Sequence, residues 1–106
     1  MRRTELRDRL LNFGFTKAQA NLYIAGLELG PALMFHLALR ANTARATAYY
    51  IMDELIRRGF FEKIKKGRRN YYSAASPEKL LQMTKERERL IKTLLPYLVS
   101  IQKDTR

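Results

Sequence analysis

The stretch from Arg40 to Gly59 reads RANTARATAYYIMDELIRRG, and its first residues predict a tight turn between two helices. Ala41 is small enough for two helices to approach closely, and Asn42 belongs to the few non-glycine types that tolerate a positive φ. Thr43 can cap a helix that begins near Ala44, because its hydroxyl can accept a bond from a free backbone N–H. The stretch therefore predicts a helix-turn-helix.

The helix after this turn has one apolar face and ends at Gly59. Its apolar residues follow the i, i+3, i+4, i+7 spacing of a core-facing helix, and they are Ala48, Ile51, Met52 and Leu55. The other side chains face elsewhere, although we expect one of the two tyrosines to be partly buried; they are Arg45, Ala46, Tyr49, Tyr50 and Asp53. Since the second helix of such a motif lies on DNA, we favour DNA contact for Arg45 over simple solvation.

Two helices are predicted upstream. The first covers residues 4–13 and ends at Gly14, which can adopt the left-handed conformation. Thr16 with Gln19 three residues later is a capping box that starts the second, and Gly30 closes it. The core face of this second helix is predicted to comprise Ala20, Tyr23, Ile24 and Leu27.

A third helix is predicted from Pro31, because proline fits the first turn of a helix. Its core face would comprise Met34, Leu37, Ala38 and Ala41. Phe35 and Leu39 are four residues apart and have two interpretations. Completion of the core is the one we slightly prefer, and an exposed patch for a protein partner is the other.

A basic hairpin follows the helix-turn-helix, with the sequence FFEKIKKGRRNYY from Phe60 to Tyr72. Two β-prone runs flank Gly67, which suits a tight turn. The hairpin carries five cations, namely Lys63, Lys65, Lys66, Arg68 and Arg69. Charged edge strands discourage aggregation, but five cations exceed that need. Three helices followed by a basic hairpin are the winged-helix order, so we predict a mainly α fold in which the hairpin is the wing.

The C-terminal part is predicted to be a long helix capped by Ser76, with a kink or break near Pro96. Its apolar stripe could pack on the first helix of the chain or pair with a second copy. We favour a homodimer, because a two-fold dimer reads two half-sites. The dimerisation residues would be Leu80, Leu90, Leu94, Leu98 and Ile101. Residues 1–75 would then be the DNA-binding domain and residues 76–106 the dimerisation element.

Composition points to a polyanionic partner. The chain of 106 residues has 21 Lys and Arg against 10 Asp and Glu, a formal net charge of +11. Without cysteine, a signal peptide or an apolar run of about 20 residues, it is expected to be cytoplasmic. A membrane surface ranks last as partner, because the cations gather on a hairpin rather than on an amphipathic helix.

Catalysis has little support in the sequence. The single histidine, His36, has no cysteine or carboxylate cluster to share a metal with. Asp53 and Glu54 are adjacent on a helix and diverge, so they do not form a catalytic pair. With no cysteine nucleophile, no phosphate-binding glycine loop and no triad-like set, we expect no enzyme activity, no metal and no cofactor.

Three stretches together resemble the N-terminal winged-helix domain of the TrmB-type archaeal transcriptional regulators: GFTKAQANLYIAGLELGPA, ARATAYYIMDELIRRGFFE and GRRNYYSAASPEKLL. The resemblance extends from about Leu10 to Leu81. It implies that the helix containing Arg45 enters the major groove and that the wing around Gly67 lies on the DNA backbone. Family members typically continue into a sugar-binding domain, whereas the sequence ends at Arg106. We therefore expect no sugar sensing and no small-molecule effector here.

The sequence thus predicts a dimeric, sequence-selective regulator of transcription that binds double-stranded DNA. Predicted DNA-binding residues are Thr43, Arg45, Ala46, Thr47, Tyr49 and Tyr50 on the helix, with Lys63, Lys65, Lys66, Arg68 and Arg69 on the wing. Two alternatives stay open. One is an architectural, sequence-independent DNA coater, suggested by the charge and the short side chains of Ala44, Ala46 and Ala48. The other is a protein-interaction module that meets its partner through Phe35 and Leu39.

Overall fold

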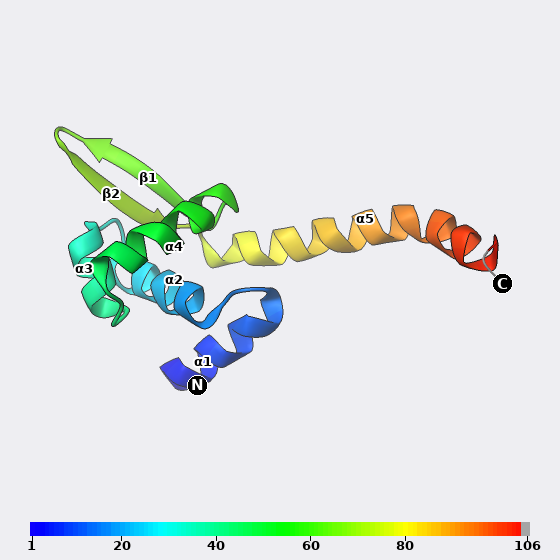
Figure 1. The fold of residues 1–106 in the computed structure, drawn as a ribbon, viewed down its shortest axis with the longest axis horizontal. Coiled ribbons are helices and arrows are strands. Elements are labelled where there is room, and N and C mark those ends of the chain that lie inside the picture. Colours follow the sequence, from blue (N-terminus) through cyan, green and yellow to red (C-terminus); the bar gives the residue numbers. More distant parts are fainter. Residues whose placement is uncertain (105–106) are drawn as a thin grey trace. The chain divides into compact units, whose positions relative to one another are not determined.

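The computed structural model describes residues 1–104, and the chain divides into two compact units, Met1–Ala75 and the segment from Ser76 onward (Figure 1). The first unit contains α1 (Arg3–Leu10), a 3-10 turn (Leu11–Phe13), α2 (Lys17–Leu29), α3 (Met34–Arg40), α4 (Arg45–Arg57), β1 (Phe61–Lys66) and β2 (Arg69–Ala74). The second contains α5 (Pro77–Asp104). This order confirms the mainly α winged-helix fold with a small hairpin and a long C-terminal helix.

The helix ends in the first half of the unit follow the sequence signals. The N–H of Gln19 donates to Thr16 Oγ1 at 3.1 Å, and the N–H of Thr16 donates to Gln19 Oε1 at 3.0 Å, which confirms the capping box. Gly14 and Gly30 have positive φ angles of 119° and 71° where their helices end. Leu27 was assigned wrongly to the core, because it lies on the exposed last turn of α2.

The turn between α3 and α4 is confirmed at Asn42, whose φ of 54° is the left-handed geometry. The cap predicted for Thr43 is wrong. Its hydroxyl donates to the carbonyl of Ala41 at 3.3 Å, and its N–H donates to the carbonyl of Ala38 at 2.9 Å. Thr43 therefore belongs to the turn, and Ala44 takes the N-cap position of α4 without a side-chain cap.

The start of α3 also differs from the prediction, since the helix begins at Met34 rather than at Pro31. Ala32 forms an isolated bridge with Tyr72 through two backbone bonds of 3.1 and 2.8 Å. A residue engaged in a bridge to β2 is extended and cannot be helical. The bridge fixes β2 against the link between α2 and α3, and so anchors the wing.

An aromatic cluster fills the core beneath the hairpin. The ring of Phe60 lies 4.6 Å from that of Phe15, and Phe15 stacks on Tyr23 at 5.5 Å, measured between ring centroids. The Tyr23 hydroxyl donates to the carbonyl of Ala75 at 2.9 Å, so the end of β2 is tied to α2. A Cβ atom on Gly26 would come within 2.6 Å of the Phe61 ring, which explains a glycine inside α2. The base of the hairpin is therefore packed firmly against α2.

In the second unit, α5 runs without interruption from Pro77 to Asp104, so of the kink or break expected near Lys92 to Tyr97, the break does not occur. A proline inside a helix removes one N–H donor, and one lost bond does not end a helix of 28 residues. At its start, the Ser76 hydroxyl donates to the Glu78 carboxylate, and this bond lowers the pKa of Glu78. No residue of α5 is buried. Within residues 1–104, no helix is both long and apolar enough to cross a bilayer.

Candidate nucleic-acid interface

The exposed face of α4 presents the predicted DNA-contacting residues to solvent. Arg45, Ala46 and Thr47 are exposed, and Thr43 in the turn is half-buried. One tyrosine is partly buried, as expected: Tyr49 is 46% exposed and its ring contacts that of buried Tyr72, whereas Tyr50 is 82% exposed. The fully buried side of α4 consists of Ala48, Met52 and Leu55.

A surface hollow of about 300 Å³ is lined by residues of both α4 and the wing. We call it the arginine hollow. Its lining comprises Leu33, Met34 and Phe35 at the start of α3, Arg45 and Tyr49 on α4, and Arg68, Arg69 and Asn70 on the hairpin. Four predicted site residues therefore meet here: Arg45, Tyr49, Arg68 and Arg69. A hollow lined by three arginines and a tyrosine from two elements suits contact with phosphates and base edges.

Two ring contacts hold the walls of this hollow. The Arg45 guanidinium carbon lies 5.2 Å from the ring centroid of Phe35. The ring of Tyr49 meets that of Tyr72 edge-on at 6.4 Å, which joins α4 to β2. Burial raises the pKa of the Tyr72 phenol, and the nearby Tyr49 phenol and Asp53 carboxylate add to that rise. Tyr72 thus packs as part of the scaffold between α4 and β2.

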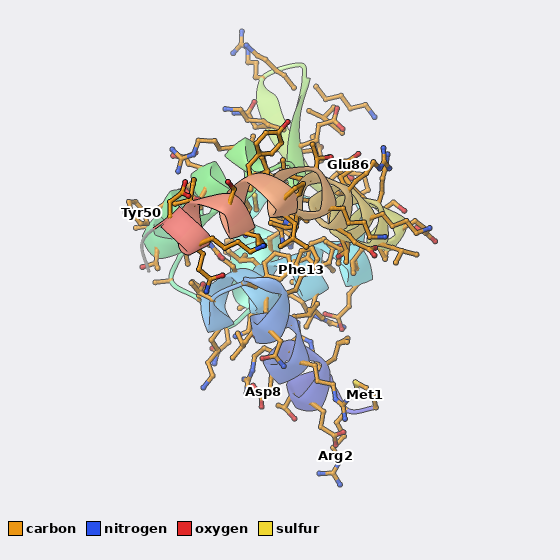
Figure 2. All side chains as sticks on the ribbon, turned by 90° about the vertical axis from the view of Figure 1, so that its right-hand side faces the viewer. Met1, Arg2, Asp8, Phe13, Tyr50 and Glu86 are labelled. Carbon is orange, nitrogen blue, oxygen red and sulfur yellow. The ribbon has the colours of Figure 1, made fainter. Side chains whose placement is uncertain are left out.

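The hairpin register divides four of the five cations between two faces, and the fifth lies in the turn. Lys63 pairs with Tyr72 and Lys65 with Asn70, so both lysines lie on the face of the buried Tyr72. Lys66 pairs with Arg69 on the opposite face. Arg68 lies in the two-residue turn beside Gly67, whose φ is 62°. All five cations are exposed, and Figure 2 shows nitrogen-tipped side chains projecting from the hairpin tip.

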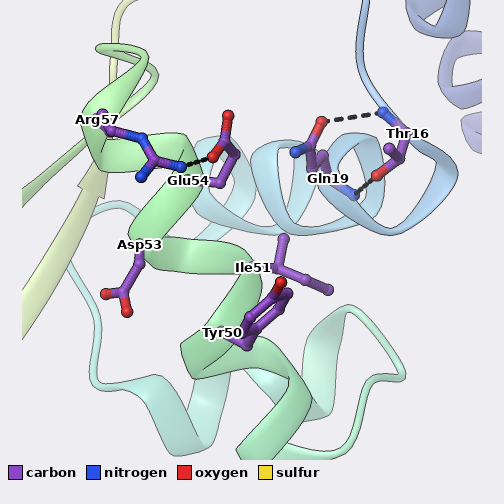
Figure 3. Close-up of a pocket in the computed structure, with 7 residues that line it drawn as sticks. All are labelled: Thr16, Gln19, Tyr50, Ile51, Asp53, Glu54 and Arg57. Carbon is purple, nitrogen blue, oxygen red and sulfur yellow. Dashed lines mark hydrogen bonds and ion pairs between the residues drawn. The ribbon is translucent and has the colours of Figure 1, made fainter.

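Tyr50, labelled in Figure 2, is not among the residues that line the arginine hollow and is 82% exposed on α4. It lines a second hollow of about 460 Å³ between α2 and α4 (Figure 3), together with Thr16, Gln19, Ile51, Asp53, Glu54 and Arg57. There Glu54 forms an ion pair with Arg57, while Asp53 points away from that pair. Two carboxylates make this hollow less suited to a polyanion than the arginine hollow.

Several features of the candidate site were not predicted from the sequence. Asn70 and Phe35 line the arginine hollow, and neither was predicted to bind DNA. The preferred assignment of Phe35 and Leu39 to the core was wrong, since they are 52% and 71% exposed. Ala48 was counted among the short side chains near the groove, but it is fully buried.

No metal site is evident in the part of the chain that the structure describes. Residues 1–104 contain no group of three His, Asp or Glu side chains that could hold a metal ion. His36 is exposed at a shallow hollow lined also by Leu29, Leu39 and Arg40.

Known proteins that are similar in sequence include a family of transcriptional regulators. The family model described as sugar-specific transcriptional regulator TrmB matches residues 10–78. The HTH-type sugar sensing transcriptional regulator TrmBL1 of Pyrococcus furiosus is 30% identical over 82 residues, which is 77% of this chain and 24% of that protein. The chain thus spans about a quarter of this relative's length.

Solved structures share the fold at lower identity. The structure of TrmBL2, an archaeal chromatin protein, has a TM-score of 0.78 and 20% identity, covering 97% of this chain and 40% of that one. A MarR family protein from Bacillus stearothermophilus has a TM-score of 0.62 and 18% identity, covering 97% and 79%. With its winged helix matched over residues 10–78, the chain belongs to the TrmB family of DNA-binding transcriptional regulators.

Proposed function

We propose that this chain binds double-stranded DNA sequence-selectively as a homodimer and regulates transcription by occupying its operator. The observation that carries the proposal is the arginine hollow, which residues of both α4 and the wing line. A recognition helix and a wing that share one surface can contact the same stretch of duplex. Repression by occlusion is the simplest mechanism.

On this proposal, α4 reads base edges in the major groove. Arg45 can donate two parallel bonds to guanine O6 and N7, the commonest specific contact. Tyr49 and Tyr50 can place a hydroxyl on phosphate or a ring on a thymine methyl. Thr43, Ala46 and Thr47 would flank these contacts, and the wing would hold the backbone or minor groove through Lys63, Lys65, Lys66, Arg68 and Arg69.

The dimer would form through the second half of α5. Eight apolar side chains from position 90 onward are exposed: Leu90, Ile91, Leu94, Leu95, Tyr97, Leu98, Val99 and Ile101. At about 100° per residue they cover roughly 200° of the helix surface, while Lys92, Ser100 and Lys103 lie on the remaining side. Monomers rarely expose so large an apolar surface. A second copy is the occupant we propose, with Leu80 extending the contact toward the start of α5.

The P. furiosus relative is named for sugar sensing. We propose only DNA-dependent regulation for this chain, which spans a quarter of that relative. An architectural DNA coater is the second candidate. It is favoured by the net charge of +11 and by the fold shared with TrmBL2, described as an archaeal chromatin protein. The short side chains near the groove support the coater less than expected. Ala48 is buried, so only Ala44 and Ala46 of the three alanines lie at the surface.

Selection from random-sequence duplexes at about 150 mM salt, where weak non-specific contacts are largely screened, distinguishes these functions. Recovery of a two-fold-symmetric motif supports the dimeric regulator. Retention without a consensus favours the coater. No retention at all contradicts DNA binding and favours a protein partner.

Removal of three wing cations is expected to weaken DNA binding in a salt-dependent manner. The triple variant Lys65→Gln, Arg68→Gln, Arg69→Gln should lower the magnitude of the slope of log K against log salt by about 2.7, at about 0.9 per phosphate neutralised. The measurement is affinity for one duplex across a salt series. The matched control, Arg2→Gln, Arg9→Gln, Lys17→Gln, removes the same charge from α1 and α2. An equal change in both triple variants would show that net charge, rather than wing contact, sets the affinity.

A further inference from the structure

We infer that Phe35 is a positioning residue for Arg45, so that α3 takes part in base reading through an aromatic platform beneath the recognition arginine. The inference rests on the proposed function, because it concerns how the same surface distinguishes one sequence from another. It assigns to Phe35 a role toward DNA, in place of either core packing or a protein-contact patch.

Exposure makes Phe35 unusual on α3. The helix already buries Met34, Leu37 and Ala38, so its core face is complete without this ring. Phe35 is 52% exposed and makes two ring contacts. The His36 ring contacts it edge-on at 5.3 Å between centroids, and the Arg45 guanidinium carbon lies 5.2 Å from its centroid. Its ring contacts are thus with a polar ring and a cation.

Within residues 1–104, the Arg45 side chain has no ion-pair partner to fix its position, so a ring beneath it can do so. No carboxylate pairs with it among the residues that the structure describes, and Arg68 and Arg69 line the same hollow. Like charges in one hollow repel each other and would drive the flexible Arg45 side chain toward open solvent. The negative face of an aromatic ring attracts a guanidinium without neutralising it. Phe35 can therefore hold Arg45 in place and leave its charge available.

The geometry is compatible with base reading at the same time. A guanidinium stacked on a ring uses its planar face, while its N–H donors point outward in the plane. Those in-plane donors are the ones that match guanine O6 and N7 in the major groove. A ring that restricts Arg45 before DNA arrives lowers the ordering cost of binding, and this gain applies only where the arginine makes its directed contact.

The test is a double-mutant cycle on the duplex recovered by selection, with a scrambled duplex of equal composition beside it. Phe35→Leu should weaken operator binding by about 3- to 30-fold and leave binding to the scrambled duplex unchanged. Phe35→Tyr keeps a ring and should restore wild-type affinity. In an Arg45→Ala background, Phe35→Leu should have less than about a twofold further effect, because the residue that it positions is gone.

Leu39→Ala is the matched control, as an exposed apolar residue on the same helix, and it should change neither affinity. Thermal unfolding of every variant verifies that the fold is intact. Two results would overturn the positioning role alone, provided that the wild-type protein prefers the operator. Either Phe35→Leu leaves operator affinity unchanged, or Phe35→Leu weakens operator binding equally in the wild-type and Arg45→Ala backgrounds. Wild-type protein that binds both duplexes equally would overturn the proposed function and this inference together.

Discussion

Replacement of Leu94 by glutamate is expected to convert the dimer to a monomer and to weaken operator binding by at least about 100-fold. Leu94 lies within the apolar arc of α5 and is 39% exposed in the single chain, so the fold does not depend on it. In the proposed interface, the new carboxylate would lie against apolar side chains of the second copy, and burying an unpaired charge costs several kcal/mol. Loss of the second half-site contact then removes the avidity of the dimer, which is typically worth 10² to 10⁴ in affinity.

Analytical ultracentrifugation gives the oligomeric state, and titration of the selected duplex gives the affinity. Ser100→Glu is the matched control, because it introduces the same charge on the polar side of α5. That variant should stay dimeric and bind normally. A Leu94→Glu protein that sediments as wild type, or a wild-type protein that is monomeric at micromolar concentration, would contradict the proposed interface.

Truncation of Phe60 to alanine is expected to lower the free energy of unfolding by about 3–5 kcal/mol, a large share of the stability of a small domain. Phe60 is fully buried, its ring lies 4.6 Å from that of Phe15, and the Arg58 guanidinium carbon lies 5.0 Å from its centroid. Its backbone also bonds to Leu55 and Ala75, at 2.8 Å in each case. A cavity here therefore loosens the base of the wing as well as the core.

Urea unfolding monitored by circular dichroism measures this change. Phe35→Ala is the matched control, since it removes the same ring from a half-exposed site and should cost well under about 1 kcal/mol. A loss below about 1 kcal/mol for Phe60→Ala would show that the aromatic cluster does not hold the hairpin to the helices.

Local chemistry in the sequence was sufficient to predict most of the fold. The Thr16 and Gln19 capping box, the left-handed Asn42 and the glycine-centred hairpin each depend on residues close in sequence, and all three are confirmed. Some errors were themselves local, such as the cap predicted for Thr43 and the break predicted at Pro96. The start predicted for α3 was wrong because distant segments meet there. The bridge between Ala32 and Tyr72 displaced the start of α3, and no local periodicity could reveal a partner 40 residues away.

The candidate site was predictable in composition but less so in arrangement. Excess charge on the hairpin and Arg45 at the start of α4 were visible in the sequence. The division of the wing cations between two faces depends on the strand register, which pairs Lys65 with Asn70. The contact between Phe35 and Arg45 depends on how α3 and α4 cross. Helical periodicity indicates whether a side chain is buried or exposed, and it does not reveal such a contact.

The most direct test of the central claim is the ratio of affinities for the selected operator and for a scrambled duplex of equal length and composition, measured at about 150 mM salt. A sequence-selective regulator should prefer the operator by about 10³ or more, with two protomers bound per two-fold-symmetric site. Equal affinity for the two duplexes would contradict sequence-selective regulation and leave the architectural coater as the function that the charge of this chain supports.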